Sequence, residues 1–351
     1  MGFVLILNPW ATEMRKYPRL DLVLLALPLA ALVAGCGADD GANGEGADRP
    51  TIVVTTTILG DVVSSMIGGH AEVSTVMPAG ASPHDFQVSA RQGQEMREAD
   101  LLIVNGAGFE EGLLDVIEAA ETDGVPVYEA ISAVDALAVG EGAGHGHGHE
   151  DEDEDETPGG PEEDHGAEDE SGSGDVDPHF FTDPGRMATA AEGILDRVVE
   201  QIPALDTPQV RQQAEDHIAE LVDLDAEIEA VLAVVPAERR VLVTNHAVFG
   251  YFADRYEFEQ VGVILPGGGT GGGASAGVLA ELADAIEREG VRAIFADTSS
   301  PTDLARTLAD EVGDVAVVEL YSESLGGAGS DADTYPAMMR TNAQRIADAL
   351  G

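Results

Sequence analysis

The chain has 351 residues, and a hydrophobic content of 44% with 24% charged residues indicates folded cores, in about two domains. Its 17 lysines and arginines against 66 aspartates and glutamates give a net charge of −49, which phosphate backbones repel, so we expect no nucleic-acid partner. The single cysteine, Cys36, excludes an intramolecular disulfide framework and a multi-cysteine metal site.

The first 35 residues have the pattern of a secretion signal. Basic residues within 15–19 precede an apolar stretch over 22–34, and these 13 residues are too few for a membrane span of ~20 residues. Either Met1 or Met14 can begin this segment, because the residues before Met14 add nothing that a signal needs. We therefore predict a signal peptide over 1–35 and no membrane-spanning helix.

The signal ends in the sequence Val-Ala-Gly-Cys, with the cysteine at position 36. This ending resembles the lipobox of bacterial lipoproteins, whose cysteine is lipidated and becomes the first residue of the mature chain. An ordinary signal peptide followed by a chance cysteine is the alternative. The resemblance implies a lipid anchor at Cys36, attachment to the membrane outside the cytoplasm, and an acidic tether over 36–50.

The segment 51–206 alternates between strand and helix patterns. In chain order we predict strands over 51–59, 73–77, 101–105 and 125–128, and helices over 60–68, 89–98, 111–119 and 184–201. This rhythm is typical of a parallel sheet covered by helices. The segment therefore predicts an N-terminal α/β lobe.

The rhythm breaks over 140–176, where no apolar periodicity can build a core. This stretch holds seven consecutive acidic residues over 150–156. Its four histidines are His145, His147, His149 and His165. Such a composition predicts a disordered surface loop. Clustered imidazoles and carboxylates can bind metal weakly, and a merely solvating insertion is the alternative.

A long amphipathic helix is predicted over 207–235. Thr207 is a natural N-cap, Pro208 suits the first helical position, and Pro236 ends the pattern. The apolar stripe consists of Val210, Ala214, Ile218, Leu221, Leu224, Ile228, Val231 and Val235. Steps of three and four residues bury one face over about 40 Å. We therefore predict a rigid spine helix, with His217 on its polar face.

The segment 236–351 repeats the strand–helix pattern. We predict strands over 241–244, 260–264, 293–296 and 315–320, and helices over 248–256, 276–289, 301–312 and 335–350. A glycine-rich stretch over 266–273 lacks the lysine of a P-loop and predicts a mobile loop at a cleft rim. The predicted fold class is α/β, with two lobes that each contain a helix-covered parallel sheet, joined by the spine helix.

Three of the nine histidines lie in loops where a strand has just ended or before a helix begins: His84, His179 and His246. Loops at the carboxyl ends of parallel strands are where ligands bind, and three imidazoles there indicate a metal site in the cleft between the lobes. Because their spacing matches no short motif, solvated loop histidines are the alternative.

Each of these histidines lies in a longer motif, and a fourth motif follows near the C-terminus. The motifs are GASPHDF over 80–86 with ADLLIVNGAGFE over 99–110, DPHFFTDP over 177–184, NHAVFGYFA over 245–253, and LYSESLG over 320–326 followed by DTY over 333–335 and MMRTN over 338–342. In this order they resemble the zinc- and manganese-binding solute-binding lipoproteins of ABC importers, and the resemblance covers residues 51–350.

The resemblance implies a set of metal ligands. They would be His84, His179, His246 and Glu323. The family usually has an aspartate at the last place, and the longer glutamate must reach from a retracted backbone, so Asp297 is an alternative fourth ligand. Glu110 and Asp85 are candidates for orienting the ligating histidines as hydrogen-bond acceptors.

The metal implied is Zn²⁺, because zinc-type relatives tend to have a histidine at the place of His246 and manganese-type relatives a carboxylate. Three neutral imidazoles and one carboxylate also suit Zn²⁺ better than Mn²⁺. The expected function is a lipid-anchored, monomeric zinc-binding protein that delivers Zn²⁺ to the membrane permease of an ABC importer and is not an enzyme. A manganese- or iron-binding member, a surface adhesin and a zinc hydrolase are the alternatives.

Overall fold

The computed structural model describes residues 49–139, 176–265, 276–299, 302–313 and 315–351, all within the compact unit Asp48–Gly351. The predicted signal peptide, Cys36, most of the tether, the four loop histidines and the glycine-rich stretch lie outside the described residues. Among the described helices, none is long and apolar enough to cross a membrane.

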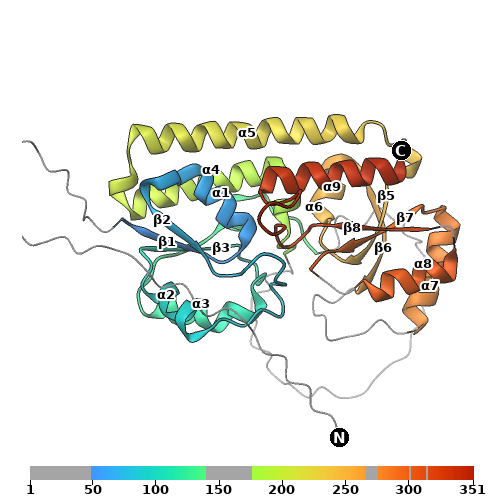
Figure 1. Cartoon of the computed structure of the whole chain (residues 1–351), viewed down its shortest axis with the longest axis horizontal. Coiled ribbons are helices and arrows are strands. Elements are labelled where there is room, and N and C mark those ends of the chain that lie inside the picture. Colours follow the sequence, from blue (N-terminus) through green and yellow to red (C-terminus); the bar gives the residue numbers. More distant parts are fainter. Residues whose placement is uncertain (1–48, 140–175, 266–275, 300–301, 314) are drawn as a thin grey trace, which may run out of the picture. The chain divides into compact units, whose positions relative to one another are not determined.

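The first lobe is built on a parallel sheet of four strands in the order β2-β1-β3-β4 (Figure 1). The strands are β1 Thr51–Val54, β2 Glu72–Thr75, β3 Leu101–Val104 and β4 Val127–Glu129. The helices are α1 Thr57–Ile67, α2 Ala90–Arg97, α3 Leu114–Thr122 and α4 Pro184–Gln201. Side chains of β1 alternate between two cores: Ile52 and Val54 pack with α1 and α4, and Val53 packs with α2 and α3.

The second lobe repeats this arrangement in the order β6-β5-β7-β8. Its strands are β5 Val241–His246, β6 Glu259–Leu265, β7 Ala293–Asp297 and β8 Ala316–Leu320. Its helices are α6 Gly250–Tyr256, α7 Ala276–Glu289, α8 Asp303–Val312 and α9 Tyr335–Leu350. The predicted fold class of two lobes with helix-covered parallel sheets is therefore confirmed.

Short 3₁₀ helices connect several of these elements. They are η1 Gly68–His70, η2 Glu111–Leu113, η3 Ala130–Ala133, η4 Phe180–Thr182, η5 Pro203–Leu205 and η6 Ala237–Arg239. The first strand is shorter than predicted, because Thr56 accepts a hydrogen bond from the Leu59 N–H and so begins α1 three residues early.

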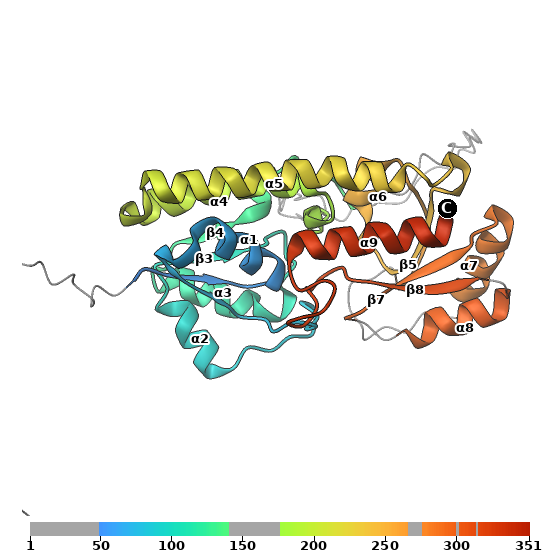
Figure 2. The same cartoon turned by 45° about the horizontal axis from the view of Figure 1, so that its top comes forward.

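The spine helix is α5, Pro208–Leu232, and it packs against α1, α4 and α9 (Figure 2). The Thr207 side chain accepts from the Val210 N–H, as the N-cap pattern predicts. The helix ends at Leu232, three residues before the predicted Val235. Val235 itself directly precedes Pro236, a position that avoids helical geometry. The residues of α5 thus contribute to one hydrophobic core that includes side chains of both lobes.

One prediction about this helix is wrong: His217 is buried, with 6% of its surface exposed, rather than on the polar face. The buried stripe runs through Val210, Ala214, His217, Leu221, Leu224 and Ile228. Its strict alternation of four and three residues selects position 217, whereas the predicted Ile218 lies at the edge of the stripe and is only partly buried.

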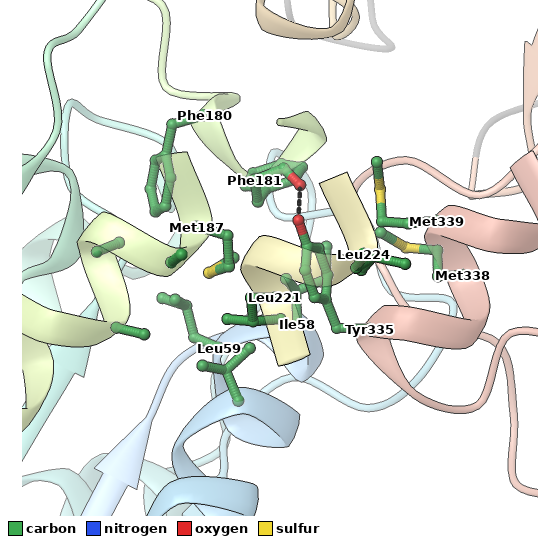
Figure 3. Close-up of a cluster of buried hydrophobic side chains, with 14 of the residues drawn as sticks. Ile58, Leu59, Phe180, Phe181, Met187, Leu221, Leu224, Tyr335, Met338 and Met339 are labelled. Atoms are coloured by element: carbon green, nitrogen blue, oxygen red, sulfur yellow. Dashed lines mark hydrogen bonds between the residues drawn. The ribbon is translucent and has the colours of Figure 1, made fainter. Parts of the chain in front are cut away.

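Figure 3 shows how the shared core joins the second lobe to the segment that contains His179. Tyr335, the first residue of α9, packs among Ile58, Leu224 and Phe181. Its hydroxyl donates a hydrogen bond to the Phe181 carbonyl oxygen, with a length of 2.8 Å. The backbone just after His179 is therefore fixed by a fully buried side chain of the other lobe.

Candidate metal centre

Four side chains from distant segments meet at the carboxyl ends of the two sheets. They are His84, His179, His246 and Glu323, and one nitrogen or oxygen atom of each lies within 4.8 Å of all the others. His84 lies in the loop after β2, and His179 directly precedes η4; both belong to the first lobe. His246 is the last residue of β5, and Glu323 follows β8, so the second lobe contributes the other two.

The Glu323 carboxylate is the centre of this group. Its Oε1 atom lies 2.9 Å from His84 Nε2, 3.3 Å from His246 Nε2 and 3.5 Å from His179 Nε2. The His84 and His246 Nε2 atoms are 3.2 Å apart. Ligand atoms at ~2.0 Å from a tetrahedral Zn²⁺ are separated by ~3.3 Å, so these spacings suit a small ion bound by all four groups.

The Nε2 atom of His179 has an unused hydrogen-bonding capacity. It is buried, and its contact with Glu323 Oε1 at 3.5 Å does not meet the geometry of a hydrogen bond. A buried polar atom without a partner is costly. A cation held by the four side chains would provide that partner.

Asp297, the alternative fourth ligand, is not part of the group. It ends β7, and its carboxylate accepts hydrogen bonds from the Ser299 N–H and hydroxyl, while its own N–H donates to Asn245 Oδ1. Burial and the nearby Glu323 carboxylate raise the pKa of Asp297. The geometry therefore favours Glu323 as the carboxylate that accompanies the histidines.

Two carboxylates hold the outer nitrogens of two of the three histidines, His179 and His84. His179 Nδ1 lies 2.7 Å from Asp177 Oδ1, which also accepts from the His179 N–H. His84 Nδ1 lies 3.0 Å from Glu111 Oε1. With these acceptors each ring donates from Nδ1 and turns Nε2 toward the centre, an arrangement common around metal-ligating histidines.

The predicted orienting role of Glu110 is wrong. Glu110 is fully buried and accepts from the Thr55 hydroxyl and from the N–H groups of Asn105 and Gly106, so it fixes the loops after β1 and β3. The neighbouring Glu111 contacts His84 instead. Asp85 is exposed. Asp177 could be identified from the motif as a partner of His179, because it lies two residues before it. Nothing in the local sequence indicates that Glu111 rather than Glu110 contacts His84.

The protonation of the group follows from its burial and its contacts. Burial alone would lower the pKa of His179, but the Asp177 and Glu323 carboxylates raise it to about 9. For Glu323, burial opposes ionisation, but the three histidines hold its pKa well below its usual range. Without a metal, the group therefore keeps a positive charge on an imidazole next to an ionised carboxylate.

We expect metal binding near neutral pH to release at least one proton, because an imidazole must be neutral to ligate. Apparent affinity should rise as the pH increases from 6.5 to about 9, because below its pKa of about 9 His179 is mostly protonated and the metal must displace that proton. The stability of the metal-free protein should change in the opposite direction. Protonated His179 stabilises the fold, and this stabilisation is lost as the pH rises over the same interval. Calorimetry in buffers of different ionisation enthalpy measures this release, and equal heats in all buffers would contradict it.

The remaining histidines of the described chain do not join the group. His70 is exposed at the end of η1. His217 lies on α5, where its Nδ1 atom is 3.2 Å from Glu220 Oε2. Apart from the four-residue group, no cluster of three or more histidine, cysteine or acidic side chains at metal-binding distance occurs among the residues that the structure describes.

Comparison with known proteins gives consistent matches over most of the chain. The model of the family described as "ZnuA: Zinc-uptake complex component A periplasmic" matches residues 52–349. The manganese-binding lipoprotein MntA of Halalkalibacterium halodurans is 27% identical, over 92% of this chain and 95% of its own length. The zinc-binding protein TroA of Treponema pallidum is 28% identical, over 86% of this chain and 89% of its own length.

The structural comparison points the same way. The solved structure of the periplasmic zinc-binding protein TroA from Treponema pallidum has a TM-score of 0.71 and 26% identity, and the match covers 86% of this chain and 99% of that one. A manganese-bound periplasmic metal-binding protein from Candidatus Liberibacter asiaticus has a TM-score of 0.70 at 17% identity, which shows a common fold.

Proposed function

The chain belongs to this family of metal-binding solute-binding proteins of ABC importers, and we propose that it captures Zn²⁺ and delivers it to a membrane permease. The observation that carries the proposal is the convergence of three Nε2 atoms on one carboxylate oxygen. In this proposal His84, His179, His246 and Glu323 are the metal ligands, and the ion is cargo.

The choice of zinc depends on the donor set. Relatives are named for manganese as well as for zinc, so family membership supports only a metal. Imidazole nitrogens suit Zn²⁺, whereas Mn²⁺ and other hard cations prefer oxygen ligands and more of them. Three nitrogens and one carboxylate therefore favour Zn²⁺ over Mn²⁺.

The same donor set argues against an enzyme. A catalytic zinc retains an open position for water or substrate, with three protein ligands. Here four side chains surround the position, and His179, His246 and Glu323 are buried. A closed shell suits a carrier that must hold its ion, and release then requires the lobes to move.

The proposed setting is outside the cytoplasm at the membrane. Several relatives are named as lipoproteins, and the lipobox-like sequence of this chain ends at Cys36. We propose that Cys36 carries the lipid anchor, that a monomer is the working form, and that His145, His147, His149 and His165 bind zinc weakly as an auxiliary to the main site.

Metal titration of a chain that lacks residues 141–174 tests the proposal. The deletion removes the auxiliary histidines and leaves the residues of both sheets intact. We expect one tightly bound zinc per chain, as in the full-length protein, and loss of only the weak zinc equivalents. At equal concentrations, Zn²⁺ should exclude Mn²⁺ from the tight site, because the histidine-rich set prefers the softer ion.

Competition with a chelator measures the tight equivalent, and metal analysis after incubation with both ions measures selectivity. Displacement of Zn²⁺ by Mn²⁺ would replace the zinc assignment with a manganese one. Loss of the tight equivalent in a folded deletion variant would mean that the deleted stretch supplies a primary ligand. Turnover of an ester, phosphate or peptide by the zinc-loaded protein would support a hydrolase instead.

A further inference from the structure

A small hydrogen-bond network joins the two lobes directly beside the metal centre. Ser324, the residue after Glu323, accepts a hydrogen bond from the Gly80 N–H with a length of 2.8 Å. Its Oγ atom is also 3.2 Å from Thr57 Oγ1. The next residue, Leu325, donates its N–H to the same Thr57 oxygen at 2.9 Å. Gly80 and Thr57 belong to the first lobe, and Ser324 and Leu325 belong to the second.

The hydrogen atoms of this network can be assigned. Thr57 Oγ1 accepts from Leu325, so its own hydrogen is free to be donated to Ser324 Oγ. The Ser324 hydroxyl donates in turn to the Leu325 carbonyl oxygen at 3.2 Å. Ser324 is 4% exposed, so water does not readily replace these partners. Every hydroxyl in the network thus has both a donor and an acceptor role.

The network lies on the segments that carry two candidate ligands. Gly80 precedes His84 by four residues in the same loop, and its φ of +79° is a conformation that favours glycine. Ser324 follows Glu323 directly, and Thr57 is the first residue of α1. The contact between His84 Nε2 and Glu323 Oε1, at 2.9 Å, is therefore supported by a second contact between the same two loops.

We propose that Ser324 and Thr57 are positioning residues that keep Glu323 next to His84 and so set the rate of metal release. The inference rests on the proposed function, since it presupposes a tightly bound metal at the four-residue group. Neither hydroxyl belongs to that group. Separation of the two loops must break the network before Glu323 can withdraw from the ion. The network therefore acts on the dissociation rate and leaves the choice of ion to the ligands.

The test compares metal release from Thr57→Val, Thr57→Ser and Ser324→Ala with release from the unaltered chain. Valine keeps the shape of threonine but removes the hydroxyl, whereas serine keeps the hydroxyl and is the matched control. Metal-loaded protein is mixed with excess chelator in a stopped-flow instrument. We expect release about tenfold faster from Thr57→Val and Ser324→Ala, which corresponds to ~1.4 kcal/mol and to the loss of one or two hydrogen bonds. Thr57→Ser should release at the unaltered rate.

Three further measurements separate positioning from a general loss of stability. The increase in release rate caused by each substitution should be the same for Zn²⁺ and Cd²⁺, because the network does not contact the ion. The double variant should be faster than either single variant, but by less than the product of the two single effects, because each single variant leaves one contact between the lobes and both remove the Thr57–Ser324 contact. Thermal unfolding of the metal-free variants shows whether each variant is folded. If Ser324→Ala does not fold, the comparison of Thr57→Val with Thr57→Ser alone tests the inference.

Unchanged release from a folded Thr57→Val variant would overturn the inference and leave the proposed function intact. Equal acceleration by Thr57→Ser would also overturn it, because the hydroxyl would then be irrelevant. Absence of tight metal from the unaltered chain would overturn the proposed function, and this inference with it.

Discussion

Replacement of His246 by alanine is expected to weaken zinc binding at the tight site by several orders of magnitude. The substitution removes one of the four candidate ligands, and its Nε2 atom lies 3.2 Å from His84 Nε2 and 3.3 Å from Glu323 Oε1. Loss of an outer partner of a metal-ligating histidine alone costs ~10–100-fold, and loss of a ligand itself should cost more. Titration against a competing chelator measures the change.

The matched control is His70→Ala, because His70 is exposed at the end of η1 and outside the candidate metal centre. This variant should bind zinc as the unaltered chain does. An unchanged tight affinity in His246→Ala would remove His246 from the ligand set and with it the main argument for zinc over manganese.

The second large effect is expected from Glu323→Gln. Glutamine keeps the length of the side chain but removes the negative charge that faces three imidazoles. Zinc affinity should fall by orders of magnitude, because the site loses its only anionic donor among the four grouped side chains. In the metal-free protein, the loss of this charge should also lower the raised pKa of His179.

The variant Asp297→Asn tests which of the two carboxylates, Glu323 or Asp297, is the fourth ligand. Asparagine keeps an oxygen that can accept from the Ser299 N–H, and Asp297 lies outside the metal group, so zinc affinity should change little. Chelator competition on both variants, with thermal unfolding as a check of the fold, gives the comparison. Strong loss of zinc in Asp297→Asn together with weak loss in Glu323→Gln would reverse the assignment of the fourth ligand.

Much of the fold could be predicted because its signals are local. Thr207 followed by proline begins α5, and Asp183 followed by proline begins α4, where its side chain accepts from the N–H groups of Gly185 and Arg186. Caps of this kind depend on residues within one helical turn. The alternation of short apolar runs with amphipathic stretches similarly predicts parallel sheets, because each parallel connection needs a crossover helix.

The four side chains that the structure brings together were also predictable, through motifs rather than spacing. His84, His179 and His246 each lie where a strand ends or a helix begins, and the carboxyl ends of parallel strands meet at one edge of a sheet. The separations along the chain carry no such signal. Only the motif around Glu323 identified a carboxylate for the fourth place.

Other features depend on which segments meet in space, and the tertiary structure alone decided them. Glu111 rather than Glu110 contacts His84 because Glu110 is held by the loops after β1 and β3. His217 is buried because α5 presents that position to the shared core. Thr57 and Ser324 meet although 267 positions separate them. Hydrophobic periodicity and capping are encoded within a few residues, whereas these contacts require both lobes to pack around the same helix, which no local pattern encodes.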